Sequence, residues 1–211
     1  MQIRWLGHAS FLITAGDIRI ITDPFHPRVG YGLYDGPADI VTVSHEHYDH
    51  NAVEYLKNKP QVINKPGSYD IKGVHIKGIP SFHDKNQGQE RGPNTIFKME
   101  IENLNLIHLG DLGHILDDRQ VQAAGKVDIL LIPVGGRYTI NAAEAFSVAE
   151  ILRPPIIIPM HFRTPHCTIQ LDPLEQFTAR FDKYVKLPYL EIDEQSLANK
   201  SGVIVLDYPV P

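Results

Sequence analysis

The sequence predicts an α/β (α+β) protein built as a four-layer αββα sandwich, with two mixed β-sheets packed face to face and helices on both outer faces. Short apolar segments rich in β-branched residues alternate with helix-like segments along the chain. Two stretches, 37–56 and 126–146, also echo one another: each runs from an acidic residue through an apolar strand and a loop to an Asn-Ala helix start. Two similar β-rich halves must each bury an apolar sheet face, which two packed sheets provide.

Length and composition predict one soluble domain covering residues 1–211. The chain is 43% apolar and 21% charged, and no apolar run is long enough to span a membrane. Cys167 is the only cysteine, which excludes an intrachain disulfide and a Cys-x-x-Cys zinc site. The start of the chain shows no signal-peptide cleavage pattern, so we expect a cytoplasmic protein. The net charge of −5 disfavours nucleic acid as a partner; we expect a small-molecule substrate, no membrane and a possible homo-oligomer.

The chain opens with three short strands at 2–6, 10–14 and 18–22, separated by Gly7 and by an Ala-Gly-Asp turn, which predicts an antiparallel start. The Pro- and Gly-rich stretch 24–37 is too irregular for a helix or strand, and we expect a loop over one end of the sheet. Apolar periodicity then predicts, in order, a strand at 39–44, a helix near 51–58, and strands near 61–64, 73–79, 94–101 and 104–108.

The second half alternates helices and strands. Its predicted elements are helices near 117–124, 141–152 and 173–183, and strands at 128–132, 156–159, 185–191 and 203–207. Two polar, glycine-containing loops, at 84–94 and 135–139, follow strands. Together with 24–37, they are the segments where we expect substrate choice to be determined.

Four metal-binding side chains follow the strand at 39–44: His45, His47, Asp49 and His50. Residues two apart in an extended segment point to the same side, so His45 and His47 can converge on one ion. Imidazoles with a carboxylate suit zinc, iron or manganese. A lone histidine beside a strand is usually a partly buried polar residue, but this density favours a metal or catalytic site.

Three later residues occupy similar positions, each just past an apolar strand: His83, Asp111 and His161. Taken alone, each has an ordinary interpretation, Asp111 as a turn residue and the histidines as partly buried polar groups. Strand ends at one edge of a sandwich can be brought together, so the combined set predicts a site with more than one metal ion.

The order of these residues resembles a known family, the metallo-β-lactamase-fold metallohydrolases, and the resemblance covers nearly the whole chain. The most specific motif is HEHYDH at 45–50. The other matching motifs are WLGHASF (5–11), TDPF (22–25), SFHD (81–84), GDLGH (110–114) and PMHF (159–162). These look like the subgroup that includes L-ascorbate-6-phosphate lactonase and N-acylphosphatidylethanolamine phospholipase D.

The resemblance implies two divalent metal ions, most plausibly zinc (Zn), with manganese, iron or nickel able to occupy the same positions. It assigns His45, His47 and His83 to one ion, and Asp49, His50 and His161 to the other. Asp111 matches the bridging carboxylate, and Asp23 matches an early aspartate that supports the ligand loop without binding metal. His8 and His114 recur near the metal site in the subgroup; they are proton donors, partners of the ligands, or ordinary hydrogen-bonded histidines.

Two ions of this kind can hold a bridging hydroxide at neutral pH as the nucleophile, with Asp49 placed to orient it. The chain has no Gly-x-Ser-x-Gly motif, consistent with a metal-generated nucleophile. Four basic residues lie near the predicted site loops: Lys85, Arg91, Arg137 and Arg163. Each is solvated surface charge or a contact to a phosphate or carboxylate on the substrate, and our hypothesis is that at least one of them is such a contact.

These features predict a metal-dependent hydrolase acting on an ester or lactone of a small metabolite that we expect to be anionic. The alternatives are a phosphodiesterase of the same fold and a non-enzymatic metal-binding module. A flavodiiron oxidoreductase is disfavoured, because such members carry an acidic residue where His47 stands. The acidity of the chain and the lack of an inserted RNA-gripping domain weigh against a nuclease.

Overall fold

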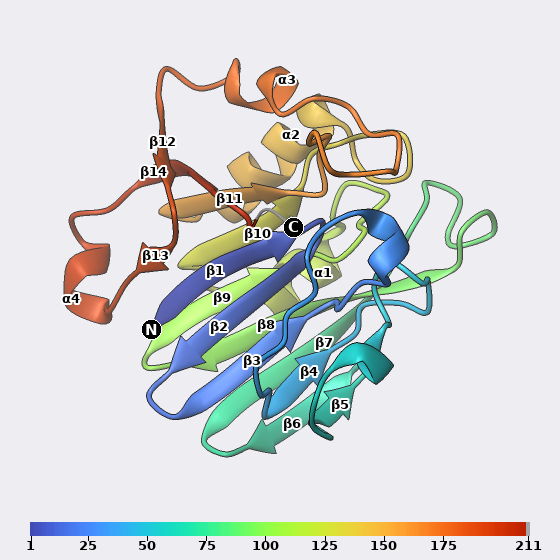
Figure 1. The fold of residues 1–211 in the computed structure, drawn as a ribbon. Coiled ribbons are helices and arrows are strands. Elements are labelled where there is room, and N and C mark those ends of the chain that lie inside the picture. Colours follow the sequence, from blue (N-terminus) through green and yellow to red (C-terminus); the bar gives the residue numbers. More distant parts are fainter. Residues whose placement is uncertain (210–211) are drawn as a thin grey trace.

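Two mixed β-sheets pack face to face in the computed structural model, which describes residues 1–209 (Figure 1). The six-stranded sheet has the order β13-β1-β2-β3-β4-β5. Its strands are β1 (Gln2–Gly7), β2 (Ser10–Ala15), β3 (Ile18–Thr22), β4 (Ile40–Thr42), β5 (Gln61–Ile63) and β13 (Leu190–Glu191). The first three strands pair antiparallel, as the sequence predicts, and β3, β4 and β5 run parallel.

The eight-stranded sheet has the order β12-β14-β11-β10-β9-β8-β7-β6. Its strands are β6 (Gly67–Ile71), β7 (Val74–Phe82), β8 (Pro93–Ile101), β9 (Leu104–His108), β10 (Ile129–Pro133), β11 (Ile156–Met160), β12 (Tyr184–Leu187) and β14 (Gly202–Leu206). β6 to β9 form an antiparallel meander, and β9, β10 and β11 are parallel. The predicted sandwich of two mixed sheets is therefore confirmed.

The core lies between the sheets and follows the alternation of strand side chains. Ile20 and Ile40 point into the inter-sheet core, whereas their neighbours Ile21 and Val41 point to the opposite face and join a second apolar cluster. All four side chains are fully buried, and each contributes about 1.5–3 kcal/mol relative to an exposed side chain. Because the six-stranded sheet is apolar on both faces, its outer face needs a cover.

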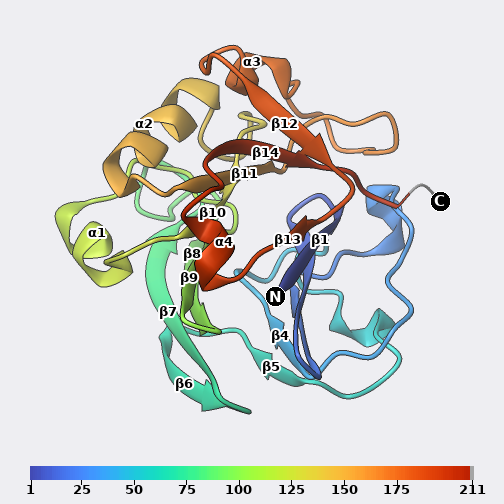
Figure 2. The same cartoon turned by 90° about the vertical axis from the view of Figure 1, so that its left-hand side faces the viewer.

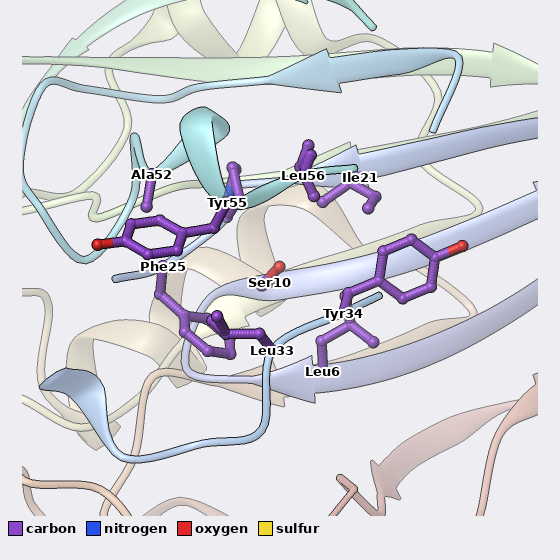
Figure 3. Close-up of a pocket in the computed structure, with 10 residues that line it drawn as sticks. Leu6, Ser10, Ile21, Phe25, Leu33, Tyr34, Ala52, Tyr55 and Leu56 are labelled. Carbon is purple, nitrogen blue, oxygen red and sulfur yellow. The ribbon is translucent and has the colours of Figure 1, made fainter. Parts of the chain in front are cut away.

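That cover is the loop 24–37, which places Phe25, Val29 and Tyr31 in the second apolar cluster. The loop contains the 3₁₀ helix η1 (Pro27–Val29), and a second 3₁₀ helix, η2 (Val53–Tyr55), lies on the same side. Residues of the loop and of the η2 region close an apolar cavity over β-strand residues (Figure 3). The cavity measures about 20 Å³, room for about one water molecule, and is too small for a substrate.

The other outer face is covered by α-helices, and Figure 2 shows α1 and α2 on the side of the molecule opposite the segment 24–60. These helices are α1 (Asp118–Ala124), α2 (Ala142–Leu152) and α3 (Glu175–Thr178), with α4 (Glu194–Leu197) following β13. Capping boxes start α1 at Asp117 and α2 at Asn141, close to the predicted starts. Among the described residues, no helix is long and apolar enough to cross a membrane.

The predicted helix near 51–58 is wrong, because only the 3₁₀ turn η2 forms there. The backbone amides of His50 and Asn51 both donate to the carbonyl of His47, and the amide of Ala52 donates to Pro24. The Asn58 side chain then bonds the backbone of Ala38 in both directions. The turn at 47–51 and the anchor at Asn58 leave too few residues between them for a regular helix.

Three smaller differences lie in the last third of the chain and near residue 70. The predicted helix 173–183 shortens to α3, and the predicted strand 185–191 splits at Pro188 into β12 and β13, which belong to different sheets. β6 and α4 were not predicted. β6 carries only one buried residue, Ile71, so it lacks the apolar signal that marks the other strands.

The topology brings several strand ends to one edge of the sandwich. β4, β7, β9 and β11 each end one to three residues before a candidate metal ligand. Parallel pairing of β9, β10 and β11 aligns their carboxyl ends, and β3 ends at Thr22 next to Asp23. All candidate ligands therefore come from chain segments that leave the sheets at this edge.

Candidate metal centre

One carboxylate oxygen lies at the middle of the site. The Nε2 atoms of His50, His83 and His161 each lie 3.2 Å from Oδ2 of Asp111. These four side chains come from four different loops and are almost completely buried. The structure thus brings together the ligands that the sequence places far apart, and it puts Asp111 between the two predicted groups.

The first group consists of His45, His47 and His83, whose ligand atoms lie within 4.8 Å of one another. Nε2 of His45 lies 3.0 Å from Nδ1 of His47, so the two imidazoles converge as their spacing predicts. Nδ1 of His45 contacts the Ser44 hydroxyl at 2.9 Å, which fixes the ring. His47 is exposed, whereas His45 and His83 are buried, so this group opens to solvent on one side.

The second group holds Asp49, His50 and His161, and the structure adds His8 to it. Nε2 of His8 lies 3.1 Å from Oδ2 of Asp49. The carbonyl of His8 accepts from the Trp5 indole and from the His161 amide, both at 3.0 Å. His8 and His161 both adopt left-handed backbone conformations, with φ of 53° and 52°. Such strain in non-glycine residues is typical of positions held by function.

One buried oxygen at this centre, Oδ1 of Asp111, has no hydrogen-bond partner within residues 1–209. Buried polar atoms are otherwise nearly always paired, so this oxygen is free to contact a cation. Neutral imidazoles and carboxylates are also the donor set expected for a divalent transition metal. The residues present therefore fit a metal centre.

The electrostatics of the site favour a cation. Burial alone raises the pKa of Asp111, but the nearby His161 and His50 lower it well below its usual range, so the carboxylate is ionised. Burial lowers the pKa of His45 to about 2 and that of His8 to about 4, so both imidazoles are neutral at pH 7. Burial also lowers the pKa of His50, yet Asp111 and Asp23 raise it well above its usual value.

Asp23 is fully buried and fixes the ligand loop. Its Oδ1 accepts from the Ser44 amide at 2.7 Å, and its Oδ2 contacts the Ser44 hydroxyl and Nδ1 of His50, the latter at 2.8 Å. It makes these contacts from a left-handed backbone conformation, with φ of 38°. Asp23 thereby orients His50 and, through Ser44, His45. This geometry agrees with a supporting role and no direct metal contact.

We therefore expect Asp23→Ala to weaken metal binding about 10–100-fold, because the rings of His50 and His45 lose their common anchor. The measurement is metal affinity by competition with a chelator. Asp117→Ala is the matched control: it removes an aspartate that caps α1, which costs about 1 kcal/mol of stability but leaves the site intact. Equal metal affinity in the two variants would contradict the anchoring role.

Two residues that position candidate ligands, Asn94 at Asp111 and Gly113 at His83, were not singled out from the sequence. The Asn94 side chain accepts from the Asp111 amide at 3.0 Å and donates to Ser81 and Leu109. Gly113 lies so close to the backbone of His83 that a Cβ atom would come within 2.3 Å of its carbonyl carbon. The only sequence signals are an amide at the start of an apolar strand and the second glycine of GDLGH.

A cavity of about 480 Å³ opens onto the centre. It is lined by Glu46, His47, Tyr48, Asp49, His83, Arg91, Asp111, Tyr138, His161 and Ile169. Of the four basic candidates, only Arg91 lines it, with its guanidinium 5.6 Å from the centre of the Tyr138 ring. Lys85 and Arg137 line a neighbouring pocket of about 300 Å³, and Arg163 is exposed and lines none of the pockets described for residues 1–209.

The loop that carries Arg91 is organised by Asp84, the last residue of the SFHD motif. Its buried carboxylate accepts four backbone N–H groups, from Asn86, Gly88, Glu90 and Arg91, at 2.8 to 3.0 Å. Burial alone raises the pKa of Asp84, but these donors lower it to about 2. Asp84 thus connects the candidate metal ligand His83 to the position of Arg91.

Two expectations are not supported by the structure. The ring nitrogens of His114 contact backbone groups, Nε2 accepting from the Phe82 amide at 3.2 Å and Nδ1 lying 2.8 Å from the Ile115 carbonyl. His114 lies outside both ligand groups and does not line the cavity, an arrangement that agrees with an ordinary hydrogen-bonded histidine at the end of β7. The loop 24–37 also contributes no lining residue, because its apolar side chains are used to cover the six-stranded sheet.

Comparisons with known proteins agree with this centre. A family model described as a beta-lactamase superfamily domain matches residues 2–161. A UPF0173 metal-dependent hydrolase of Methanoculleus marisnigri is 30% identical over 187 residues, covering 78% of this chain and 82% of that protein. A UPF0173 metal-dependent hydrolase of Thermus thermophilus is 28% identical over 190 residues, covering 78% and 84%.

A crystal structure from Thermotoga maritima, proposed to be a Zn-dependent hydrolase of the metallo-beta-lactamase superfamily, matches with a TM-score of 0.83 and 39% identity over 99% of both chains. The narrower resemblance to the lactonase and phospholipase D subgroup stays a prediction. The family model, the curated relatives and this structure agree on one assignment: the chain belongs to the metallo-β-lactamase superfamily, in its UPF0173 family of metal-dependent hydrolases.

Proposed function

We propose that this hydrolase uses two divalent ions, most plausibly zinc, to cleave an ester or lactone of a small anionic metabolite. The convergence of three imidazoles on one oxygen of Asp111, beside an open cavity, is the observation that carries the proposal. A shared carboxylate between two histidine groups is the arrangement expected of a two-metal site. The proposed Zn dependence of the Thermotoga maritima protein supports zinc as the metal.

The residues that would hold the first ion are His45, His47 and His83, and those for the second are Asp49, His50 and His161. Asp111 lies between the groups and would contact both ions. When bound, two such ions supply a deprotonated water as nucleophile and polarise the oxygen of the scissile bond.

Asp49 and His8 are placed to orient the attacking water molecule. The side chain of Asp49 is 14% exposed and lines the cavity, so it can accept a hydrogen bond from a water molecule there. Burial raises the pKa of Asp49, but the hydrogen bond from His8 and the nearby His50 lower it below its usual range. His8 is a neutral donor to Asp49 and positions that carboxylate.

Arg91 is placed to bind the anionic group of the substrate. It borders the metal cavity, it packs against Tyr138, and its backbone is fixed by Asp84. It forms an ion pair with Glu90 at 3.7 Å, which is weak because the Glu90 side chain is exposed to solvent. A guanidinium in this position can donate two parallel hydrogen bonds to a carboxylate or phosphate.

Arg91→Ala is expected to raise KM about tenfold or more for an anionic ester, with a smaller change in kcat, because a charge-assisted hydrogen bond contributes about 1.5–3 kcal/mol. The measurement is steady-state kinetics with an anionic ester and its neutral methyl ester. Arg163→Ala is the control, since Arg163 is exposed and lines neither the metal cavity nor the neighbouring pocket. An unchanged KM in alanine variants of Arg91, Lys85 and Arg137 alike would contradict anion binding by these side chains.

A substrate panel tests the reaction class with the metal-loaded protein. Hydrolysis of lactones and carboxylic esters, with no cleavage of bis-p-nitrophenyl phosphate or cyclic nucleotides, is the result we expect. Preferential cleavage of phosphodiesters would establish the phosphodiesterase alternative. Full metal occupancy without cleavage of either class would favour a non-enzymatic metal-binding module.

A further inference from the structure

A second cavity, of about 570 Å³, meets the metal cavity at three shared side chains: Glu46, His47 and Arg91. It runs from there between the chain that follows β5 and the ends of β7 and β8. We call it the strand-end groove and define it by its apolar lining residues Pro66, Pro80, Phe82 and Pro93. A substrate held at His47 has two directions in which to extend, and the strand-end groove is the second of them.

The apolar side chains of the groove form one continuous surface. Pro80 and Phe82 are two residues apart on β7 and project from the same face. Phe82 of β7 pairs directly with Pro93 of β8, and the backbone of Pro66 lies close to Gly78 of β7. All four apolar groove residues are exposed, Phe82 to 37%. Leaving these four apolar side chains in contact with water forfeits about 25 cal/mol for each Å² that could be buried, so the stability of the fold alone does not explain their exposure.

The polar groups along the groove are already used inside the protein. Ser81 and Asn94 hydrogen-bond each other, and Asn94 also donates to Leu109. Ser44 contacts Asp23 and His45, and Asn64 donates to Glu46 at 3.1 Å. A ligand therefore meets apolar surface along the groove, with the charges of Glu46, Lys65 and Arg91 at its margins.

We infer that the strand-end groove binds the acyl chain of the substrate, so that the preferred substrate is an amphiphilic ester with an unbranched alkyl arm. This inference rests on the proposed hydrolase function. The arm lies along Phe82 and the three prolines while the scissile bond lies at His47 and the anionic group lies at Arg91. A proline ring is apolar and its backbone has no N–H group, so these prolines can pack against an alkyl chain without offering a hydrogen-bond donor.

The test measures binding without turnover. Straight-chain alkane hydroxamates of increasing length are titrated into the metal-loaded full chain by calorimetry. Each added methylene is expected to lower Kd about fourfold until the groove is filled. Phe82→Ser, which removes apolar surface, and Pro66→Trp, which fills the groove, are expected to reduce this dependence to about twofold or less per methylene. Tyr184→Ser on β12 is the control; this tyrosine is 42% exposed and distant from the groove.

The inference is overturned if Kd does not depend on chain length, or if the dependence is the same in wild type, both groove variants and the control. Thermal unfolding measurements check whether each variant is folded. Because one substitution removes apolar surface and the other fills the groove, either variant is sufficient for the test if the other does not fold. The failure of the proposed function has a different signature: a chain-length dependence of Kd that the groove variants remove, with no hydrolysis of any ester. Hydrolysis of an ester without a dependence of Kd on chain length would reject the groove inference and leave the proposed function standing.

Discussion

Asp111→Asn is expected to abolish turnover and to lower metal affinity by about a thousandfold. The substitution keeps the size of the side chain but removes a buried charge that three imidazoles face at 3.2 Å. Removing one partner from a buried charged network costs about 3–5 kcal/mol, which sets this magnitude. The amide also places N–H donors or a neutral oxygen where a shared anion stood. Metal content by elemental analysis and turnover on the best ester check the prediction together.

Asp70→Asn is the matched control for Asp111→Asn. Asp70 also contacts a histidine, His75, but its side chain is 82% exposed and lies outside both ligand groups. We expect His47→Ala to lose turnover and metal as well, because His47 belongs to the first group and is its exposed member. Normal metal content in Asp111→Asn or in His47→Ala would show that the ligand assignment is wrong.

Gly135→Ala is expected to displace His161 and so to weaken the second ligand group. A Cβ atom on Gly135 would come within 2.1 Å of the backbone oxygen of His161, and that contact has no flexible side chain to relieve it. The forced shift should destabilise the protein by about 1–3 kcal/mol. His161 already holds a strained, left-handed backbone conformation, so it cannot easily absorb this shift. We therefore expect its imidazole to move away from Asp111. Metal stoichiometry and thermal unfolding measure the two effects.

Gly16→Ala separates this steric effect from ordinary backbone strain. Gly16 lies in the turn between β2 and β3, with φ of +55° and no atom near the added Cβ. Its replacement should cost about 1–2 kcal/mol of stability and leave metal binding unchanged. If Gly135→Ala retained the metal stoichiometry of Gly16→Ala, the close approach to His161 would not be needed for the site.

The positions of the candidate ligands could be predicted from sequence because His45, His83, Asp111 and His161 each follow an apolar strand within one to three residues. His83 and His161 follow β7 and β11, and both strands show the apolar pattern of a buried strand clearly. The sheets then bring these ends together, a consequence of topology that periodicity and the internal echo already indicate. The roles of His45 and His47 could be predicted for a similar reason, since their spacing alone puts both rings on one side.

Other features depend on contacts that no local pattern reveals. The helix predicted near 51–58 fails because the amide of Ala52 bonds Pro24 and the side chain of Asn58 bonds Ala38, both distant in sequence. From the sequence, Asp84 is an ordinary loop aspartate, because only the structure shows the four backbone N–H groups that it accepts. Arg91 was one of four equivalent basic candidates, and only the fold shows that it borders the metal cavity.

The most direct measurement of the metal-centre proposal is the number of divalent ions bound per chain during chelator removal and stepwise reconstitution, with turnover recorded at each step. Two ions per chain are predicted, held by the groups of His45, His47 and His83 and of Asp49, His50 and His161. Turnover should disappear in the metal-free protein and return as the ions are replaced. A reconstituted chain that binds no ion, or a metal-free chain that keeps full turnover, would contradict the proposal.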